Sequence, residues 1–230
     1  MALLLLAISI LPVVLLMIYV TRQDKYEKEP PGMLILAFLG GCFSIVLDLL
    51  LVSLINSIYV SDTVFYSAFM EAGFPEEICK FAMLLLIVWR SKHFNEPMDG
   101  IVYATFVGLG FACIENILYV FSSGFGTGIM RAIISVPGHF LFGVLMGYFF
   151  ALAKFSQEKT PLLLLSVLVP ACAHGLFDWL LMVTDRLSTF GQAIVVVLFV
   201  VGDIILWVVG VRYIRKHRES SPFKYTQPNT

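Results

Sequence analysis

The sequence predicts an all-α membrane protein, a polytopic bundle of about seven transmembrane helices. Hydrophobic residues make up 59% of its 230 residues and charged residues only 13%. This leaves too little polar surface to cover a water-soluble fold of that size. Apolar runs long enough to cross about 30 Å of hydrocarbon recur along the chain, and only short polar loops separate them. Together these features indicate a multi-pass protein of the lipid bilayer.

The apolar runs follow one another at residues 2–21, 32–59, 63–89, 100–122, 129–153, 161–184 and 191–213. The first run lacks the preceding basic residues and the small-residue cleavage site of a secretory signal, so we interpret it as a true span. No separate soluble domain is visible between the runs. We therefore expect one transmembrane domain at 1–213 and a cytoplasmic tail at 214–230.

The basic residues predict the orientation of the chain. They gather in the loops after the first, third and fifth runs and in the tail: Arg22, Lys25, Lys28, Arg90, Lys92, Lys154, Lys159, Arg212, Arg215, Lys216, Arg218 and Lys224. Loops rich in Lys and Arg stay in the cytoplasm. We therefore expect the N-terminus outside the cell and the C-terminus in the cytoplasm.

Several polar residues lie within the apolar runs: Asp48, Glu71, Glu76, Glu77, Lys80, Glu115, His139, His174, Asp178 and Asp203. A charged group at the bilayer centre costs about 2.5–3.5 kcal/mol, so these side chains should face one another or a water-filled cavity. Counted from the outer ends of the helices, most lie roughly 9–20 Å below the outer surface. We expect a shared polar layer in the outer half of the bilayer.

Helical spacing pairs some of these residues. His174 and Asp178 are four positions apart, as are Glu76 and Lys80, so each pair shares a helix face. A carboxylate that holds an imidazole fixes its tautomer for catalysis or metal binding.

The stretch GFPEE at residues 73–77 allows two interpretations. Pro75 followed by two acids suits the first turn of a helix that begins inside the membrane, and a continuous helix with a proline kink is the alternative. Adjacent glutamates point about 100° apart. We therefore expect one of Glu76 and Glu77 to pair with Lys80 and the other to face the cavity.

This layer contains the groups needed for hydrolysis. A buried carboxylate beside another suits a general base that takes a proton from water, and histidines and a further glutamate can polarise a carbonyl, protonate a leaving amine or bind a metal.

An ion-coupled transporter is the alternative, because intramembrane acids and histidines also form ion pathways. The confinement of the layer to the outer half, and the lack of an evident inverted repeat, favour hydrolysis. Asp48, Glu71 and Asp203 are candidates for cavity walls or supporting partners.

Four ordered motifs carry a resemblance to a known family. They are Glu76-Glu77-x-x-Lys80, Phe111-x-x-x-Glu115, His139 in VPGHFLFGVLMGY, and His174-x-x-x-Asp178. Together with the loops DKYEKEPP and EPMDG, they make the chain from about Asp24 to Asp178 similar to the PrsW family of intramembrane proteases.

The resemblance implies a protease domain with its core at 63–184 in a bacterial cell membrane. It further implies the first (site-one) cut in a single-pass membrane anti-sigma factor, as part of a stress response. The partners expected are membrane lipids and that protein substrate, and no nucleic acid.

The family is in turn similar to the CAAX prenyl proteases, whose motifs are EExxxR, FxxxH and HxxxN. This implies that Glu76 is the base, that Glu77, Glu115, His139 and His174 are catalytic, and that Lys80 and Asp178 are supporting residues. Asn116, next to Glu115 in sequence, is a further candidate for a supporting residue. Glu76, Glu115, His139 and His174 are also candidate ligands of a zinc ion, and a metal-free glutamate site is the alternative that we favour.

Two other features have packing interpretations. Asn116 suits a hydrogen bond between helices, or alternatively a contact with a substrate carbonyl. The Gly143-x-x-x-Gly147 motif predicts close helix packing.

Overall fold

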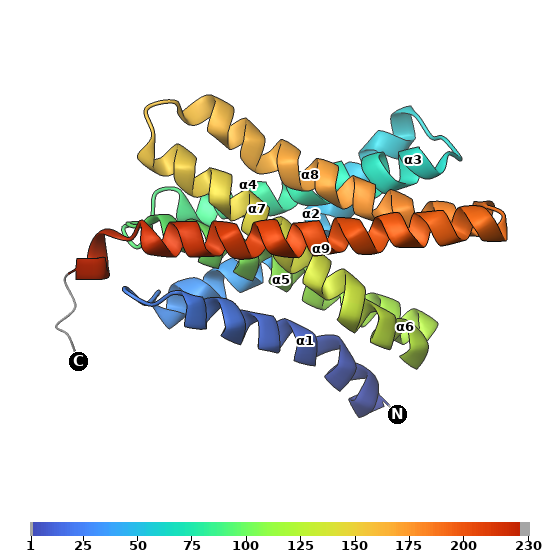
Figure 1. Ribbon diagram of the computed structural model, residues 1–230, viewed down its shortest axis with the longest axis horizontal. Coiled ribbons are helices and arrows are strands. Elements are labelled where there is room, and N and C mark those ends of the chain that lie inside the picture. Colours follow the sequence, from blue (N-terminus) through green and yellow to red (C-terminus); the bar gives the residue numbers. More distant parts are fainter. Residues whose placement is uncertain (1, 226–230) are drawn as a thin grey trace.

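The computed structural model describes residues 2–225, and within that range the chain is helical without β-strands (Figure 1). Its α-helices are α1 (Ala2–Gln23), α2 (Pro31–Ile58), α3 (Val64–Tyr66), α4 (Phe74–Val88), α5 (Pro97–Ser123), α6 (Phe125–Met130), α7 (Val136–Phe155), α8 (Lys159–Val183) and α9 (Thr189–Glu219). Two π-helical segments, η1 (Ser67–Gly73) and η2 (Arg131–Ser135), precede α4 and α7, and short 3-10 turns lie at Thr184–Arg186 and Pro222–Tyr225.

The prediction of an all-α membrane bundle is confirmed. Six helical stretches of the described chain are long and apolar enough to cross a membrane: α1, α2, α5, α6 to α7, α8 and α9. The remaining predicted run, the third at 63–89, forms α3, η1 and α4 in direct succession. Helix α9 continues to Glu219, so the first part of the predicted tail is helical, and residues 226–230 lie outside the described range.

Helix α5 lies at the centre of the bundle and packs against α7, α2 and α1. Its residues from Met98 to Cys113 are all buried. Glycines make the contact with α7 close. A Cβ atom on Gly147 would lie 2.3 Å from the carbonyl oxygen of Gly100, and one on Gly143 would lie 3.0 Å from that of Ala104. The close packing predicted from Gly143 and Gly147 is therefore confirmed.

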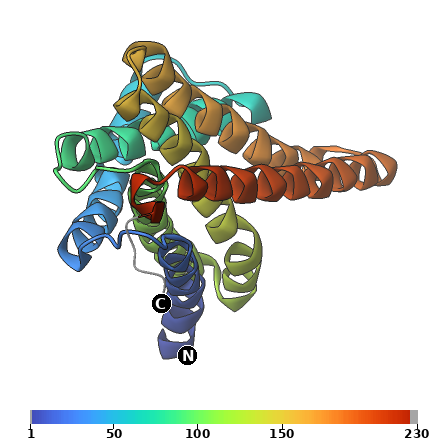
Figure 2. The ribbon, with the colours of Figure 1, turned by 60° about the vertical axis from the view of Figure 1, so that its left-hand side comes forward.

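Helices α1 and α9 expose most of their apolar side chains on the outside of the bundle. The turn between α8 and α9 projects from the bundle (Figure 2). Exposed leucine, valine and isoleucine along these helices are the side chains expected at a lipid-facing surface.

The helix that carries GFPEE is continuous. Gly73 and Phe74 have helical dihedral angles, and the N–H of Phe74 bonds to the carbonyl oxygen of Phe69, five residues back. The interpretation that a helix begins at this point inside the membrane is therefore wrong. A proline ring clashes with the carbonyl four residues back in an ordinary α-helix, and the wider π turn before Pro75 relieves that clash.

The same arrangement recurs before α7. Segment η2 ends at Ser135, Pro137 follows in the first turn of α7, and His139 comes two residues later. Glu76 and Glu77 follow Pro75 in the same way. Single π turns of this kind are common at functional sites, and here each one sets the direction of polar side chains in the next turn.

Candidate active site

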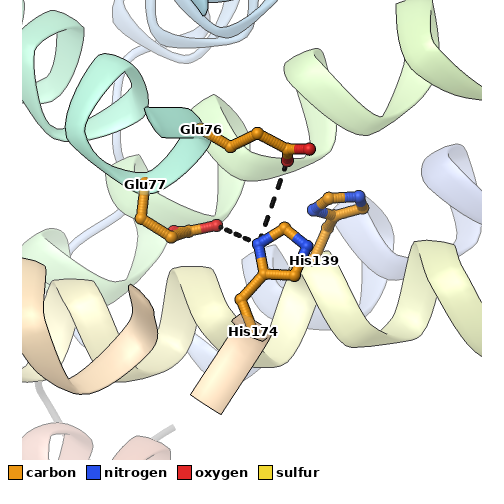
Figure 3. Close-up of side chains that lie close together, drawn as sticks. All are labelled: Glu76, Glu77, His139 and His174. Carbon is orange, nitrogen blue, oxygen red and sulfur yellow. Dashed lines mark hydrogen bonds and ion pairs between the residues drawn. The ribbon is translucent and has the colours of Figure 1, made fainter. Parts of the chain in front are cut away.

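Helices α4, α7 and α8 bring four ionisable side chains together in the interior (Figure 3). Glu76 and Glu77 come from α4, His139 from α7 and His174 from α8, and all four are buried. One nitrogen or carboxylate oxygen from each lies within 4.8 Å of the others. Residues that the sequence separates by up to 98 positions thus form one cluster, as the shared polar layer predicted.

Glycines at the crossing of two elements allow this approach. A Cβ atom on Gly73 would lie 2.7 Å from the backbone nitrogen of Gly175 and 2.9 Å from the carbonyl oxygen of Ala171. Gly73 precedes the glutamates by three and four residues, and Gly175 follows His174 directly. The backbones of η1 and α8 therefore touch beside the cluster, which brings Glu77 within reach of His174.

Lys80 lies in the middle of the cluster. Its Nζ donates to Glu76 Oε2 at 2.9 Å and to Glu77 Oε1 at 2.8 Å, and lies 3.2 Å from His139 Nδ1. It also lies 4.0 Å from the centroid of the Phe111 ring. The expectation that Lys80 would pair with only one glutamate is wrong, because a long side chain at i+3 and i+4 reaches both carboxylates.

His174 contacts carboxylates through both ring nitrogens. Its Nδ1 lies 3.0 Å from Glu77 Oε1 and 3.9 Å from Glu76 Oε2, the two contacts drawn in Figure 3. Its Nε2 lies 3.4 Å from Asp178 Oδ2, so the predicted pair forms. The ring of Phe142 stacks on the imidazole with centroids 4.6 Å apart and fixes its plane.

His139 links the cluster to Glu115 on α5. Since Lys80 has only donors, His139 Nδ1 must accept from it, and the proton of the neutral ring is then on Nε2. That nitrogen lies 2.9 Å from Glu115 Oε2. Arg131 Nη2 donates to the same oxygen at 2.6 Å. Glu115 therefore serves His139 and Arg131 and lies outside the four-residue cluster, in which Glu77 takes the place we expected for it.

Asn116 forms the helix-to-helix hydrogen bond that was one of its two interpretations. Its amide nitrogen donates to the Ser9 carbonyl on α1 at 3.0 Å, and its oxygen accepts from Arg131 Nε at 3.1 Å. It thereby holds the guanidinium that contacts Glu115.

A cavity of about 330 Å³ reaches the cluster from one side. Its walls include Glu76 and Glu115, and also Asp48, Glu71 and Tyr119. Two of the three candidate wall residues therefore line it. The third, Asp203, lines a separate apolar groove between α8 and α9 with Phe177 and Phe199.

Sequence reasoning missed two residues of this site. Arg131 was not among the polar residues considered within the apolar runs, although an arginine inside the run 129–153 was itself a signal. The π turn η2 changes the helical register between Arg131 and His139, so spacing alone does not show that they converge. Phe142 looked like an ordinary core residue, and no signal in the sequence distinguished it.

The side chains of the cluster are of the kinds that bind zinc, since imidazole and carboxylate are ligands of that ion. The arrangement does not suit it, because the Lys80 ammonium lies within 3.2 Å of donor atoms of Glu76, Glu77 and His139. A divalent ion about 2 Å from the same atoms would meet a positive charge at close range. The cluster as folded already contains its cation.

Comparison with known proteins agrees with this site. Residues 29–205 match the model of a family described as PrsW family intramembrane metalloprotease. "Protease PrsW" of Clostridioides difficile is 36% identical over 224 residues, which cover 93% of this chain and 91% of that protein. Proteins of the same name from Geobacillus kaustophilus and Bacillus subtilis are 37% and 35% identical, over 79% and 75% of this chain and 81% and 80% of their own lengths.

No solved structure matches the chain. The transporter alternative is not favoured, because both comparisons point to proteases. The family match covers more than half of the chain, and it includes every residue of the cluster. The chain belongs to the PrsW family and is a multi-pass intramembrane protease.

Proposed function

We propose that this protease makes the first cut in a single-pass membrane anti-sigma factor of a bacterial cell, by glutamate-activated water in the outer half of the bilayer. The observation that most supports the glutamate mechanism is the placement of Glu76, and the substrate class rests on the family resemblance. Glu76 belongs to the buried cluster and also lines the cavity through which water and a peptide segment can approach.

Glu76 is the general base of this proposal. Its Oε2 accepts from Lys80, and the structure of residues 2–225 records no hydrogen bond from another protein group to Oε1. That oxygen is free to take a proton from a water molecule in the cavity, which then attacks the peptide carbonyl. Lys80 fixes the carboxylate by its ammonium and limits the directions from which water can approach.

His174 is the proton donor to the leaving amine. To donate to Glu77 at one nitrogen and Asp178 at the other, its ring must carry protons on both. Glu77 and Asp178 orient this ring, and after one proton moves to the amine the ring still has one to share with a carboxylate.

The pair His139 and Glu115 lies next to His174, because the centroids of the two imidazole rings are 5.1 Å apart. Glu115 lines the cavity, and Arg131 beside it carries a positive charge that is only partly buried. We assign His139 to hold Lys80 and Glu115 in place, and the Arg131 and Glu115 pair to position the substrate backbone. With these roles the reaction needs no metal ion, which agrees with the position of the Lys80 ammonium among the atoms that would bind one.

The proposed orientation puts the N-terminus outside and the C-terminus in the cytoplasm. Contacts at one end of the bundle support it, because they gather the basic loops. Arg218 donates to Gln23 at 2.6 Å, and Lys154 donates to the carbonyl of Trp89 at 2.6 Å. The ends of α1, α4, α7 and α9 therefore share one face, which is the basic one.

Coexpression with a tagged single-pass anti-sigma factor tests the proposal. We expect the wild-type chain to shorten the substrate and Glu76→Gln to leave it intact, because the amide cannot accept the proton. Asp62→Asn, which changes an exposed acid in the loop before α3 that is neither in the cluster nor in the cavity wall, is the matched control and should cut normally. Cutting by a folded Glu76→Gln chain would refute the base role, and an intact substrate with wild type would refute the substrate class.

A further inference from the structure

A second group of acidic residues lies at the other end of α5 from Glu115. Asp24, Glu27 and Glu29 come from the loop between α1 and α2, and Glu96 and Asp99 from the start of α5. Asp99 precedes Glu115 by 16 residues, about 24 Å along the helix. These residues belong to the DKYEKEPP and EPMDG loops, whose acids have no part in the candidate active site.

The acids of this group have oxygens without a protein partner. Asp24 Oδ1, Glu29 Oε1 and Asp99 Oδ1 are buried and unpartnered, and their side chains are 1%, 5% and 0% exposed. Glu27 Oε2 is also buried and unpartnered. A buried carboxylate is normally paired with a cation or bound to a metal. We therefore expect these oxygens to have a partner that is not part of the protein.

No basic side chain in the described part of the chain forms an ion pair with these five acids. Lys28 lies between Glu27 and Glu29 in sequence, and it donates to the carbonyl oxygens of Thr21 and Asp24. Burial raises the pKa of the Asp24 carboxyl to about 7, so the group is costly to ionise in this setting.

Other hydrogen bonds hold the acids in fixed directions. Asp99 Oδ2 accepts from the N–H groups of Asn95 at 2.9 Å and Glu96 at 2.8 Å. Glu29 accepts from the Tyr103 hydroxyl and Glu96 from the Ser221 hydroxyl. Each of these three carboxylates therefore has an oxygen that is already bonded, and the Glu96 side chain also accepts from the N–H of Asp99. The buried oxygens that stay without a partner belong to Asp24, Glu27, Glu29 and Asp99.

A shared proton can satisfy part of this group. Glu29 and Asp99 are close enough to hydrogen-bond to each other when one of them is protonated. When no cation is bound, that proton satisfies one oxygen on each of these two residues and leaves Glu27 and Asp24 without a partner, and a cation bound by Asp99 would displace it. One carboxylate oxygen each from Glu27, Glu96 and Asp99 lies within 4.8 Å of the others, which is the separation that a single ion can bridge.

We propose that Glu27, Glu96 and Asp99 bind a hard divalent cation, Mg²⁺ or Ca²⁺. Both ions prefer oxygen ligands, and the site offers carboxylates without histidine or thiolate. The cation joins the loop after α1 to the start of α5 and, through the contact of Ser221 with Glu96, to the end of α9. This site is independent of the proposed cleavage reaction.

Thermal unfolding of the full chain in detergent tests the proposal. After treatment with EDTA and removal of the chelator, MgCl₂ or CaCl₂ is titrated in separate arms. We expect a saturable rise in Tm, on the order of 5 °C at a hundredfold excess over the dissociation constant. Glu27→Gln keeps the side-chain volume at a half-buried position and should abolish the rise. The control Glu158→Gln, at an exposed acid in another loop, should retain it.

A direct binding measurement, made on two separate variants, distinguishes loss of the cation site from failure of one variant to fold. Isothermal titration should give one Mg²⁺ or Ca²⁺ per wild-type chain and none for Glu27→Gln or for Asp99→Asn. Equal binding by wild type and both variants would overturn the assignment. A wild-type chain without heat or Tm response to either ion would also overturn it and would indicate that protons alone satisfy the carboxylates.

Discussion

Lys80 is the residue on which the candidate active site depends. Its side chain is 2% exposed, and its ammonium contacts Glu76, Glu77 and His139 at 2.8 to 3.2 Å. Three groups that would otherwise be costly to bury share one positive charge, and Phe111 covers it with the face of its ring. The arrangement keeps Glu76 fixed beside the cavity.

Removing this charge should destabilise the fold. We expect Lys80→Met to lower the free energy of unfolding by about 3–5 kcal/mol, because it leaves buried carboxylates unpaired, and to abolish cleavage. Adding Glu76→Gln should restore part of the stability and none of the activity. Thermal unfolding and substrate cleavage measure the two effects. Equal stability of Lys80→Met and wild type would contradict the buried ion network.

Zinc removal tests the metal-free site. We expect cleavage in membranes to persist with 1,10-phenanthroline, which binds zinc strongly, and to persist equally with the non-chelating 1,7-isomer. Because this reagent prefers soft and borderline metals, the proposed Mg²⁺ or Ca²⁺ site should be unaffected. A selective loss with the 1,10-isomer, reversed by added Zn²⁺, would show that the Lys80 arrangement opens to admit a metal.

Arg131 should act through Glu115. A hydrogen bond to a charged group contributes about 1.5–3 kcal/mol, so we expect Arg131→Gln to reduce cleavage on the order of tenfold or more. Arg131→Lys should restore part of the rate. Arg186→Gln removes an exposed arginine that bonds to the carbonyl of Asp62 and should cut at the wild-type rate. An unchanged rate for Arg131→Gln would remove this residue from the site.

At the scale of elements, the crossing of η1 and α8 decides whether the site forms. Gly73 contacts the backbone of Gly175 and Ala171 more closely than any side chain allows. Backbone atoms cannot rotate away as a flexible side chain can. The two elements must therefore separate if a methyl group enters, and Glu77 and His174 would separate with them.

Gly73→Ala should thus inactivate the enzyme although it leaves every polar residue unchanged. We expect cleavage to be lost and Tm to fall. Gly202→Ala on α9 is the control, because an added Cβ there meets nothing within 4 Å. Should Gly73→Ala cut at the wild-type rate, the close crossing is not what positions the glutamates.

At the scale of the whole molecule, the orientation in the membrane decides from which side the substrate is cut. In a background with the native cysteines replaced, we expect Ser122→Cys to react with an impermeant maleimide in intact cells. Glu158→Cys should react only after the cells are opened. Both positions are exposed and lie at the ends of different spans. The reverse labelling pattern would invert the proposed orientation.

The sequence alone predicted the fold class and most of the polar residues of the candidate site. Composition and run length determine that a chain is a helical membrane bundle, because hydrocarbon leaves few other ways to satisfy backbone hydrogen bonds. The cost of charges in lipid then identifies Glu76, His139, His174 and their neighbours as groups that must meet.

How these groups meet depends on the packing of the helices. Periodicity gives the face of a helix that a residue occupies, but the π turns before α4 and α7 shift that face, and glycine crossings set which helices touch. For this reason Glu77 lies in the cluster where Glu115 was expected, Lys80 bonds to both glutamates, and Arg131 joins the site. These outcomes depend on distances between helices, which the order of residues along one helix does not contain.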